Sequence, residues 1–543
     1  MMAAPARRLA RGVVQSLPWT AELYQRWGAH GEPPPAGYRL DRLAAALPVW
    51  VEAARRATAH GVMERPRRVL VFAFLGWWVE HAAALSLLMA AVGHRVTLLT
   101  LPYRRWTVDP PRFDLRRQRT YIKDALRPAA AVLRFGDLTK SSKGRLPARL
   151  RAEVDHQSLL DVQYTLQRED VDLAGDLEAA SLYRLRRRRN SHAASGALGW
   201  IARTGADAVI VPNGSILEFG AVYRAARAYG VPVTTYEFGE QRQRLWLAQN
   251  AQVMKLDTSE LWRVRSLTPL TQPERDSLEG LYAARRSGAG WANFARQWQS
   301  GASEGAVSTR ERLGLDPRRP VVLLCTNVVG DSLALDRQIF TKGMADWLTE
   351  SVRHLAARPE IQVVVRVHPG ELLGAGHPSQ EIVQGSLPAV PESLHVVPPD
   401  SPVNTYDLIE LAHLGLVYTS TVGMEMAMAG VPVVVAGETH YRGKGFTHDP
   451  RSWKEYYEAV DRLLADPPER RLADEQIQLA QRYAARFFFE YPFPFPWHLI
   501  GFWDDMAARP MESVVAPDGL QPYRRTLRAL TGEPINWAEA RPR

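Results

Sequence analysis

The stretch VYTSTVGMEMAMAGVPVVVA, residues 417–436, decides the fold of the second half of this 543-residue chain. It reads as a strand, a turn of small residues, a short helix and a second strand. Gly430 is expected to end the helix and Pro432 to stop it from continuing, after which three valines form a buried parallel strand. The segment therefore predicts one βαβ unit of a parallel sheet.

The turn between the first strand and the helix has the residues of a phosphate site. Ser420, Thr421 and Gly423 stand where the helix opens, so backbone N–H groups, two hydroxyls and the helix dipole would face a phosphate. Glu425 follows in the first turn of the helix, where its carboxylate would accept hydrogen bonds from the hydroxyls of a ribose. The alternative is an ordinary βαβ turn in which Glu425 is only an acid at a helix start.

A second segment, IQVVVRVHPGE at residues 361–371, is a β-branched run that stops at a His-Pro pair. Arg366 and His368 are two residues apart and are expected on one face at the carboxyl end of a strand. Ligands of open α/β sheets bind beyond the carboxyl ends of the strands. We therefore interpret both residues as cationic partners of the same phosphate, the alternative being a structural histidine whose hydrogen bonds are satisfied.

These two segments, followed by HYRGKGFT at residues 440–447, resemble the capsule polysaccharide biosynthesis family, which includes the Kdo transferases. The resemblance is specific over about residues 320–447 and general before them. It implies an α/β protein of the GT-B fold, with two Rossmann-like domains facing a cleft and the donor in the C-terminal one. It also implies that His368 and the Ser420–Thr421 turn contact the donor phosphate and that Glu425 binds the ribose.

The activity that this resemblance implies is a glycosyltransferase of surface or capsular polysaccharide biosynthesis. It would transfer a sugar from a nucleotide-sugar donor to a glycan or lipid-linked acceptor. The resemblance favours a CMP-linked donor, since Arg366, His368, Ser420 and Thr421 would surround one phosphate position. A diphosphate, which would need Lys444 or Arg442 from the loop at 440–447, is the alternative. Two alternatives stay open: a nucleotide-sugar epimerase of the UDP-GlcNAc 2-epimerase type, and a non-catalytic scaffold of an envelope-assembly complex.

Composition bounds the class of protein. The chain is 46% hydrophobic and 23% charged, which suffices for two large α/β domains with additional helices. Its one cysteine, Cys325, lies in the apolar run VVLLCT and is expected in a core, as in a cytoplasmic protein. No apolar run approaches the roughly 20 residues that cross a bilayer. The N-terminus lacks the apolar core of a signal peptide.

A formal charge of +10 requires a partner or a structural reason. The basic residues concentrate in two clusters: Arg104, Arg105, Arg112, Arg116, Arg117 and Arg119, and Arg184, Arg186, Arg187, Arg188 and Arg189. Nucleic acid is disfavoured because aromatic residues do not alternate with these arginines. An anionic membrane surface or a lipid-phosphate acceptor would explain the charge, and so would a solvated helix face. Residues 1–27 could form an interfacial amphipathic helix at the inner membrane face or a helix packed on the body.

The order of strand and helix signals along the chain predicts the domains. They are an N-terminal helical segment at 1–66, an acceptor domain at 67–290, a nucleotide-sugar domain at 309–485 and a C-terminal crossover segment at 486–543. The polar, arginine-rich residues 104–198 are interpreted as a helical insertion in the acceptor domain. The Gly-, Ala- and Ser-rich residues 287–308 are the expected linker. The aromatic run at 487–497 contains too many prolines for a strand.

Inverting glycosyl transfer needs a base near the acceptor hydroxyl. Three places beyond predicted strands offer one: Glu80 with His81, Asn213 with Glu218, and Glu237 with Glu240. The segment EFGE that contains the last pair loosely resembles the acidic motif of the polysialyltransferases, with phenylalanine in place of the second acid. Each of these acids could instead cap a helix or be solvated.

Four further residues are expected near the donor. Asn327 and Asp331 lie in the first turn of the C-terminal domain, where Gly330 allows close approach. Tyr441 and Lys444 lie in a glycine-flanked loop that would close over the phosphate or be a surface loop. No His and Cys spacing of a metal site occurs, so no metal is expected. The leaving phosphate would then be stabilised by the helix dipole and basic side chains.

Overall fold

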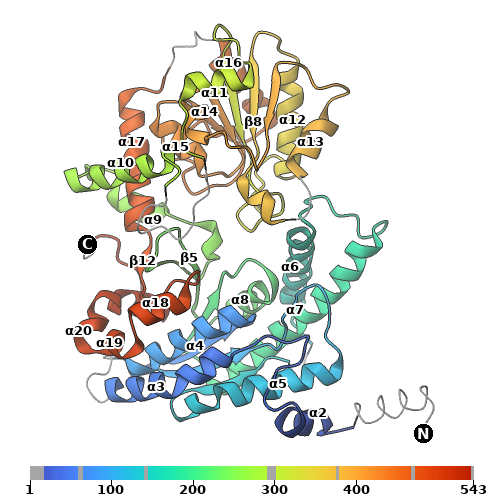
Figure 1. The fold of residues 1–543 in the computed structure, drawn as a ribbon, viewed down its shortest axis with the longest axis vertical. Coiled ribbons are helices and arrows are strands. Elements are labelled where there is room, and N and C mark those ends of the chain that lie inside the picture. The colour runs from blue at the N-terminus through green and yellow to red at the C-terminus, as the bar shows by residue number, and fades with distance from the viewer. Residues whose placement is uncertain are drawn as a thin grey trace.

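The computed structural model describes residues 17–58, 65–139, 145–289, 301–374, 378–465 and 471–539. Two α/β domains lie one above the other along the long axis of the molecule, each built around its own sheet (Figure 1). The predicted α/β class with two Rossmann-like domains is confirmed, and the arrangement is that of the GT-B fold.

The first sheet has the order β12-β6-β5-β4-β1-β2-β3, and β1 to β5 are parallel. Its strands are β1 (Arg68–Ala73), β2 (Arg95–Thr100), β3 (Arg134–Asp137), β4 (Ala208–Pro212), β5 (Val233–Phe238), β6 (Arg244–Gln249) and β12 (Phe493–Pro494). The helices of this domain are α2 (Thr20–Leu23), η1 (Tyr24–Gly28), α3 (Asp41–Thr58), α4 (Gly76–Ala91), α5 (Arg112–Leu126), η2 (Arg127–Ala131), α6 (Ala148–Leu166), α7 (Leu177–Thr204), α8 (Leu217–Tyr229) and η3 (Val253–Lys255).

The second sheet is wholly parallel, in the order β11-β10-β7-β8-β9. Its strands are β7 (Val321–Cys325), β8 (Gln362–Arg366), β9 (Leu394–Val397), β10 (Leu414–Val417) and β11 (Val433–Val435). The helices from the link between the domains onward are α9 (Ser259–Arg265), α10 (Gln272–Arg286), α11 (Ala306–Leu313), α12 (Met344–Ala356), η4 (Pro369–Leu373), α13 (Pro378–Ser386), α14 (Thr405–Leu411), α15 (Val422–Met428), α16 (Trp453–Ala465), α17 (Asp474–Ala485) and η5 (Arg486–Glu490).

Both sheets reverse their order of winding at one place. When the parallel strands of each domain are numbered from one along the chain, both sheets have the spatial order 3-2-1-4-5. This is the order of dinucleotide-binding folds. The reversal falls between β1 and β4 in the first domain and between β7 and β10 in the second. Crossover helices leave on opposite faces there, so the loops at the carboxyl ends separate and leave room for a ligand.

The cores follow from the sequence of the central elements. The strands flanking each reversal are apolar and buried on both faces, as parallel strands between helix layers must be. Helix α4 is apolar nearly all round because it lies between the first sheet and α3. Cys325 is buried in the second domain, which confirms its expected place.

The interpretation of residues 104–198 as a helical insertion is wrong. Strand β3 lies within this range and pairs in parallel with β2 over Thr97–Thr100. It escapes hydrophobic pattern analysis because it is a four-residue strand at the edge of the sheet with the sequence RFGD, where charged residues are expected. The range is therefore a regular continuation of the first Rossmann-like unit.

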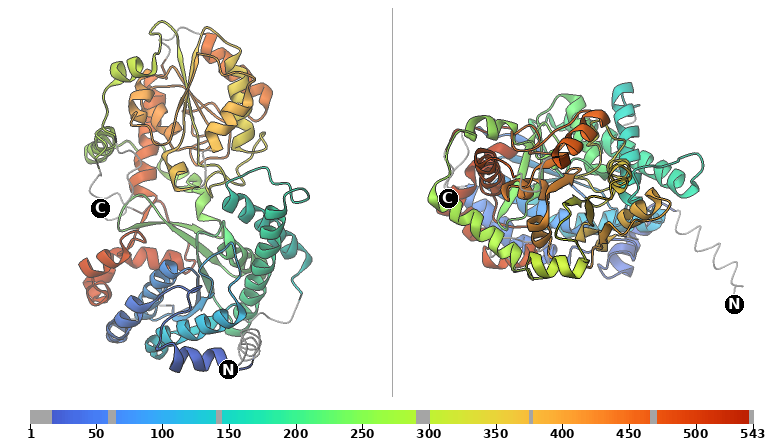
Figure 2. Two further views of the ribbon diagram at one scale, coloured as in Figure 1. Left: turned by 45° about the vertical axis from the view of Figure 1, so that its right-hand side comes forward. Right: turned by 90° about the horizontal axis from the view of Figure 1, so that it is seen from above.

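The chain returns to the first domain after α17, which descends from the second domain in the views of Figures 1 and 2. The expectation that residues 487–497 hold no strand is wrong, because Phe493 and Pro494 pair with Leu245 and Arg244 of β6. Proline is tolerated there because β12 is an edge strand. The helices that follow are α18 (Phe502–Ala508), α19 (Met511–Val515), α20 (Pro517–Leu520), η6 (Gln521–Tyr523) and α21 (Arg524–Leu530), and residues from them join the core of the first domain.

The densest arginine cluster is largely paired within the protein. Arg186 is fully buried and donates to Asp161 (3.1 Å) and Glu218 (2.7 Å). Arg189 is also buried, and its guanidinium lies 3.9 Å from the ring centre of Tyr103. These two arginines therefore do not face a membrane or a nucleic acid. Residues 1–16 of the expected N-terminal amphipathic helix lie outside the described residues, and within the described ranges no helix has the length and hydropathy of a membrane span.

Candidate active site

A cavity of about 410 Å³ lies between the two domains, at the reversal points of both sheets. The first domain contributes residues at the carboxyl ends of β1, β4 and β5, among them Leu75 and Asn213 just beyond their strands and Glu237 within β5. The second domain contributes residues that follow β7 and β10, including Asn327 and the Thr419–Thr421 turn. Because both walls are carboxyl-end loops, the cavity stands where open α/β sheets bind ligands.

The wall from the first domain contains strained backbone. Leu75 (φ 67°), Asn213 (φ 56°) and Leu217 (φ 54°) all have left-handed φ values and all line the cavity. Such a conformation costs on the order of 1 kcal/mol or more for a leucine, so the surrounding structure must hold it in place. Strain of this kind concentrates at functional sites.

Glu237 is the acid best placed for chemistry. Its side chain is half-buried on the cavity wall, and one carboxylate oxygen accepts a hydrogen bond from the amide nitrogen of Asn213 (3.0 Å). The other accepts the backbone N–H of Phe238 (3.1 Å). Glu240 also lines the cavity, but it is ion-paired with Arg285. Glu237 is therefore held in a defined orientation at the start of the loop after β5.

The wall from the second domain is a network of short polar side chains. The side-chain oxygen of Asn327 accepts the backbone N–H of Thr419 (3.2 Å), which joins the loop after β7 to the loop after β10. The hydroxyl of Tyr441 donates to the backbone oxygen of Ser420 (2.5 Å) from below the turn. These bonds hold the Ser420 and Thr421 hydroxyls at the cavity surface.

His368 is neutral in the unliganded protein. Burial lowers the pKa of its imidazole to about 4, and the nearby charge of Arg366 acts in the same direction. Its Nδ1 accepts the backbone N–H of Gly370 (2.9 Å), so the proton of the neutral ring is carried by Nε2. The expectation of a cationic His368 is thus wrong for the unliganded protein, in which the ring can serve as a neutral hydrogen-bond donor.

The structure brings together seven of the predicted site residues on the walls of one cavity, namely Glu237, Glu240, Asn327, Asp331, His368, Ser420 and Thr421. They come from both domains and from the carboxyl ends of four strands, β5, β7, β8 and β10. Tyr164 supports this convergence independently. Burial raises the pKa of its phenol to about 12, and the negative charges of Asp331 from one domain and Glu237 from the other contribute to the rise.

Glu425 is not on the cavity wall, so the expectation that it is exposed to the cleft is wrong. Its carboxylate is buried, pairs with Arg285 and accepts a hydrogen bond from the hydroxyl of Tyr406 (2.6 Å). Burial raises its pKa, an effect that the charge of Arg285 opposes. Since Arg285 also pairs with Glu240, this guanidinium links Glu425 of the second domain to Glu240 of the first.

Four other predicted donor contacts also lie away from the cavity walls, namely Arg366, Gly423, Tyr441 and Lys444. Arg366 is buried and donates to the backbone oxygen of Pro398 (2.6 Å), so it supports the loop after β9. Gly423 is needed for packing, because a Cβ there would collide with the hydroxyl of Tyr441. Lys444 is half-buried, beside the charge of Asp257, which raises the pKa of its ammonium while burial lowers it more strongly.

Three candidate bases of the first domain are structural. His81 is fully buried, and its ring lies 4.7 Å from that of Phe238. Glu80 accepts a hydrogen bond from the indole of Trp503 (3.1 Å), outside the cavity. Glu218 is buried in the ion pair with Arg186. Glu80 and His81 lie in the second turn of α4, and Glu218 lies in the first turn of α8. The register of each helix turns these side chains toward other helices or the core, and the position of the preceding strand end does not reveal that register.

Sequence reasoning missed several residues on the cavity walls. Lys255 and Arg337 bring positive charge, and His440 brings an imidazole whose pKa burial lowers to about 3. Trp106 and Tyr164 bring aromatic surface, with ring centres 6.5 Å apart. These residues lie in loops or in the middle of a helix, where no local pattern distinguishes them from ordinary surface residues.

Metal ligands are not gathered anywhere in the part of the chain that the structure describes, where no three His, Cys, Asp or Glu side chains form a candidate metal group. One Asp-x-Asp sequence, Asp170-Val171-Asp172, lies in the turn between α6 and α7. Both aspartates are exposed and neither lines the cavity.

Fold and cavity together define the class of protein, a GT-B protein with its ligand site between two Rossmann-like domains. Residues 292–483 match the profile of the family described as capsule polysaccharide biosynthesis protein. This match confirms the resemblance seen in the sequence. No curated protein sequence matches the chain.

Solved structures similar to this chain include two from Thermosulfurimonas dismutans KpsC. The beta Kdo 2,4 transferase is 18% identical with a TM-score of 0.34, over 54% of this chain and 82% of that one. The beta Kdo 2,7 transferase is 16% identical with a TM-score of 0.31, over 55% and 82%. The UDP-GlcNAc 2-epimerase from Neisseria meningitidis bound to UDP-GlcNAc is 12% identical with a TM-score of 0.25, over 78% and 100%.

Replacing Glu425 with alanine is expected to destabilise the protein. The change removes one of the two carboxylates that neutralise Arg285 and leaves the Tyr406 hydroxyl without its acceptor. Breaking a buried pair costs about 3–5 kcal/mol, and the retained Glu240 places the expected loss near the lower end, about 3 kcal/mol. Urea denaturation measures it, with Glu458→Ala as the exposed control. A loss below 0.5 kcal/mol would contradict the structural role of Glu425.

Replacing His81 with phenylalanine is expected to weaken the pH dependence of stability. Burial lowers the pKa of His81 to about 3, so between about pH 6.5 and pH 3 the unfolded chain binds a proton that the folded protein does not. Within this window the free energy of unfolding therefore decreases as the pH is lowered, by at most about 1.4 kcal/mol per pH unit for one group. Denaturation of the variant at pH 7 and pH 5 should show a smaller fall than in the wild type. An unchanged fall, or loss of catalytic turnover in the folded variant, would contradict this assignment.

Proposed function

We propose that this protein is a glycosyltransferase that transfers a sugar from a nucleotide-sugar donor to an acceptor in surface or capsular polysaccharide synthesis. The observation that carries the proposal is the cavity at the reversal points of both sheets. It has a held carboxylate, Glu237, on one wall and the polar turn with His368 on the other. The family of residues 292–483 supports the connection to capsule polysaccharide.

The donor is assigned to the second domain. His368 would donate from Nε2 to the donor phosphate, and the hydroxyls of Ser420 and Thr421 would donate beside it. Lys255 and Arg337 add positive charge to the same space. In this proposal these groups stabilise the leaving phosphate without a metal, because they offer hydrogen bonds and charge where negative charge develops.

Glu237 is assigned as the base that activates the acceptor. The acceptor hydroxyl oxygen attacks the anomeric carbon of the donor and forms the new glycosidic bond. The bond from that carbon to the phosphate oxygen breaks, its electron pair leaves with the nucleotide, and the hydroxyl proton passes to Glu237. Asn213 would keep the carboxylate aimed at the hydroxyl, since it holds one oxygen at 3.0 Å.

An epimerase is the second candidate, because it would also bind a nucleotide sugar between two Rossmann-like domains. An epimerase needs no acceptor, so a closed site would suit it. The cavity instead continues into a larger open groove through shared residues, which favours a transferase. A scaffold without catalysis is also disfavoured, because the strained and hydrogen-bonded cavity walls would have no purpose. Membrane association is not included in this proposal.

Replacing Glu237 with glutamine should abolish transfer and leave donor binding intact. The amide keeps the size of the side chain but cannot take a proton, so turnover is expected to fall by about 10²–10⁴-fold. The assay incubates the protein with a panel of nucleotide sugars and acceptor glycans and measures released nucleotide by mass spectrometry. Glu80→Gln is the matched control, since Glu80 lies outside the cavity. Full activity in Glu237→Gln would remove this residue from the mechanism.

We propose that the nucleotide of the donor is CMP, in which cytidine carries a single phosphate. A nucleotide that binds only the folded protein stabilises it by about 2.7 kcal/mol at a concentration 100 times its dissociation constant. CMP is therefore expected to raise the melting temperature more than UDP or GDP at equal concentration. Lys255 and Arg337 could also accommodate a second phosphate. Stabilisation by UDP or GDP but not by CMP would overturn the CMP assignment and leave the glycosyltransferase proposal standing.

A further inference from the structure

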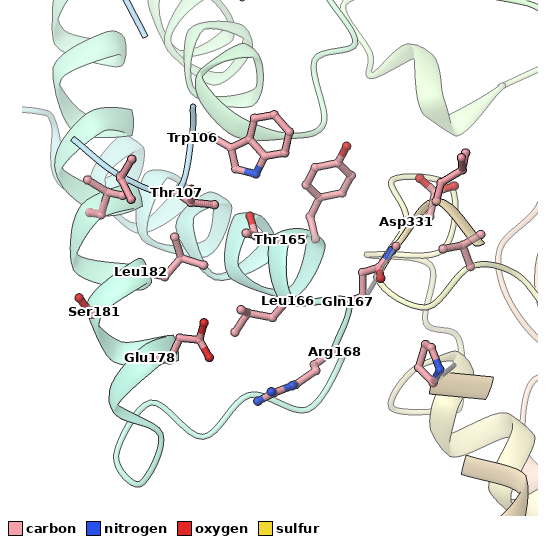
Figure 3. A pocket seen from close by; sticks show the side chains of 18 of the residues that line it. Trp106, Thr107, Thr165, Leu166, Gln167, Arg168, Glu178, Ser181, Leu182 and Asp331 are labelled. Carbon is pink, nitrogen blue, oxygen red and sulfur yellow. The ribbon is translucent and has the colours of Figure 1, made fainter. Parts of the chain in front are cut away.

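A second and larger hollow of about 1640 Å³, here called the groove, opens between the domains beside the cavity. One side is formed by the loop after β2, the end of α6 and the start of α7. The other is formed by the loop after β7 and by the η4–α13 segment. Figure 3 shows Trp106, Thr165 and Leu166 on the first side and Asp331 on the opposite side.

The groove leads into the cavity. Trp106, Tyr164, Val328 and Asp331 line both hollows, so the two are continuous at this point. Glu237 lines the same cavity as these four residues. A ligand that occupies the groove would therefore extend its end toward the proposed base.

The size of the groove fits a chain-like ligand. Sites for single small molecules usually enclose about 300–1,000 Å³. The cavity falls in this range and suffices for a donor, whereas the groove exceeds it. The groove is therefore too large for one further sugar and has the dimensions for several linked units.

The chemistry of the groove fits a carbohydrate. A sugar offers hydroxyls that donate and accept, and C–H faces that pack on aromatic rings. The junction supplies the rings of Trp106 and Tyr164, and the buried indole N–H of Trp106 has no hydrogen-bond partner within the structure described. Farther out, Thr107, Thr165 and Ser181 supply hydroxyls. Both basic and acidic side chains line the walls, including Arg168, Arg184, Glu178 and Glu381. This mixture of charges suits a polar chain better than an apolar or highly charged one.

The contacts at one end of the groove hold its two sides together. The carboxylate of Glu169 accepts the backbone N–H of Ala345 at the start of α12 (2.7 Å). Gly330 has a φ of 73°, and a Cβ there would lie 2.7 Å from the backbone oxygen of Gln163 at the end of α6. The α6–α7 turn thus packs against the second domain, which keeps the groove formed without a bound ligand.

We propose that the groove binds an oligosaccharide acceptor of several sugar units, with its terminal sugar passing Trp106 and Tyr164 to reach Glu237. This assignment rests on the proposed transferase function and names its acceptor class. The residues nearest the junction select for a carbohydrate, and the outer walls set the number of units bound. Affinity is therefore expected to rise with the length of the acceptor.

The test uses the full-length protein on an array of bacterial oligosaccharides of one to six units. Ser181→Trp places a large side chain in the groove from an exposed position on α7, and Trp106→Ala removes the ring at the junction. Ala228→Trp is the matched control, because Ala228 is exposed near the end of α8 and lines neither the groove nor the cavity. Stabilisation by CMP, UDP and GDP is measured for every variant.

Wild type and Ala228→Trp are expected to bind glycans of three or more units better than single sugars. Ser181→Trp should weaken that binding at least tenfold and leave nucleotide stabilisation unchanged, because Ser181 lines the groove alone, and Trp106→Ala should also weaken glycan binding at least tenfold. Binding that ignores length, survives Ser181→Trp or is absent in the wild type overturns the proposal. If a nucleotide stabilises the protein but no glycan binds, only the groove assignment fails. If glycans bind through the groove and no nucleotide stabilises the protein, the transferase proposal fails instead.

Discussion

The reversal of strand order in each sheet is the constraint on which the site depends. Right-handed crossovers place successive helices on one face until the order reverses, and the loops on either side of that point must diverge. Here the reversal occurs twice, between β1 and β4 and between β7 and β10. Because the domains are stacked with these edges toward each other, two openings that are small by themselves form one cavity with walls of different chemistry.

The contacts between the domains determine which acidic side chains remain on the cavity walls. The guanidinium of Arg285 pairs with Glu240 on one side and Glu425 on the other. Glu169 of the first domain accepts a backbone N–H at the start of α12 in the second. These polar links hold the two walls of the cavity at a fixed separation. Because the linking side chains are charged, a charged ligand in the cavity would change the strength of the links. Glu237 and His368 remain on the walls, while Glu425 is committed to the link.

Much of the fold could be predicted from the sequence because its central strands are apolar and its turns contain glycine and proline. The β-branched strand before His368 and the valine strand at 433–435 were readable in this way. Edge strands were not, since β3 is polar and β12 contains proline. Site residues near the carboxyl ends of strands, such as Glu237 in β5 and Asn327 after β7, were placed correctly on the cavity because that edge of each sheet forms a cavity wall.

Residues inside the first two turns of a helix were harder to place. Glu80, His81, Glu218 and Glu425 all follow strands, but each has a helical register that turns it away from the cavity. That register depends on packing against partners such as Arg186 and Arg285, which are distant in sequence. Trp106 and Tyr164, the aromatic residues at the junction of the groove and the cavity, come from the loop after β2 and from the end of α6. Only the tertiary structure brings them together.

The most direct test of the central claim is a crystal structure of the protein with the nucleotide that stabilises it most. The account predicts that the phosphate lies against His368, Ser420 and Thr421, with the open side of the site facing Glu237. Nucleotide bound elsewhere, or a phosphate held away from the loops after β7, β8 and β10, would contradict it.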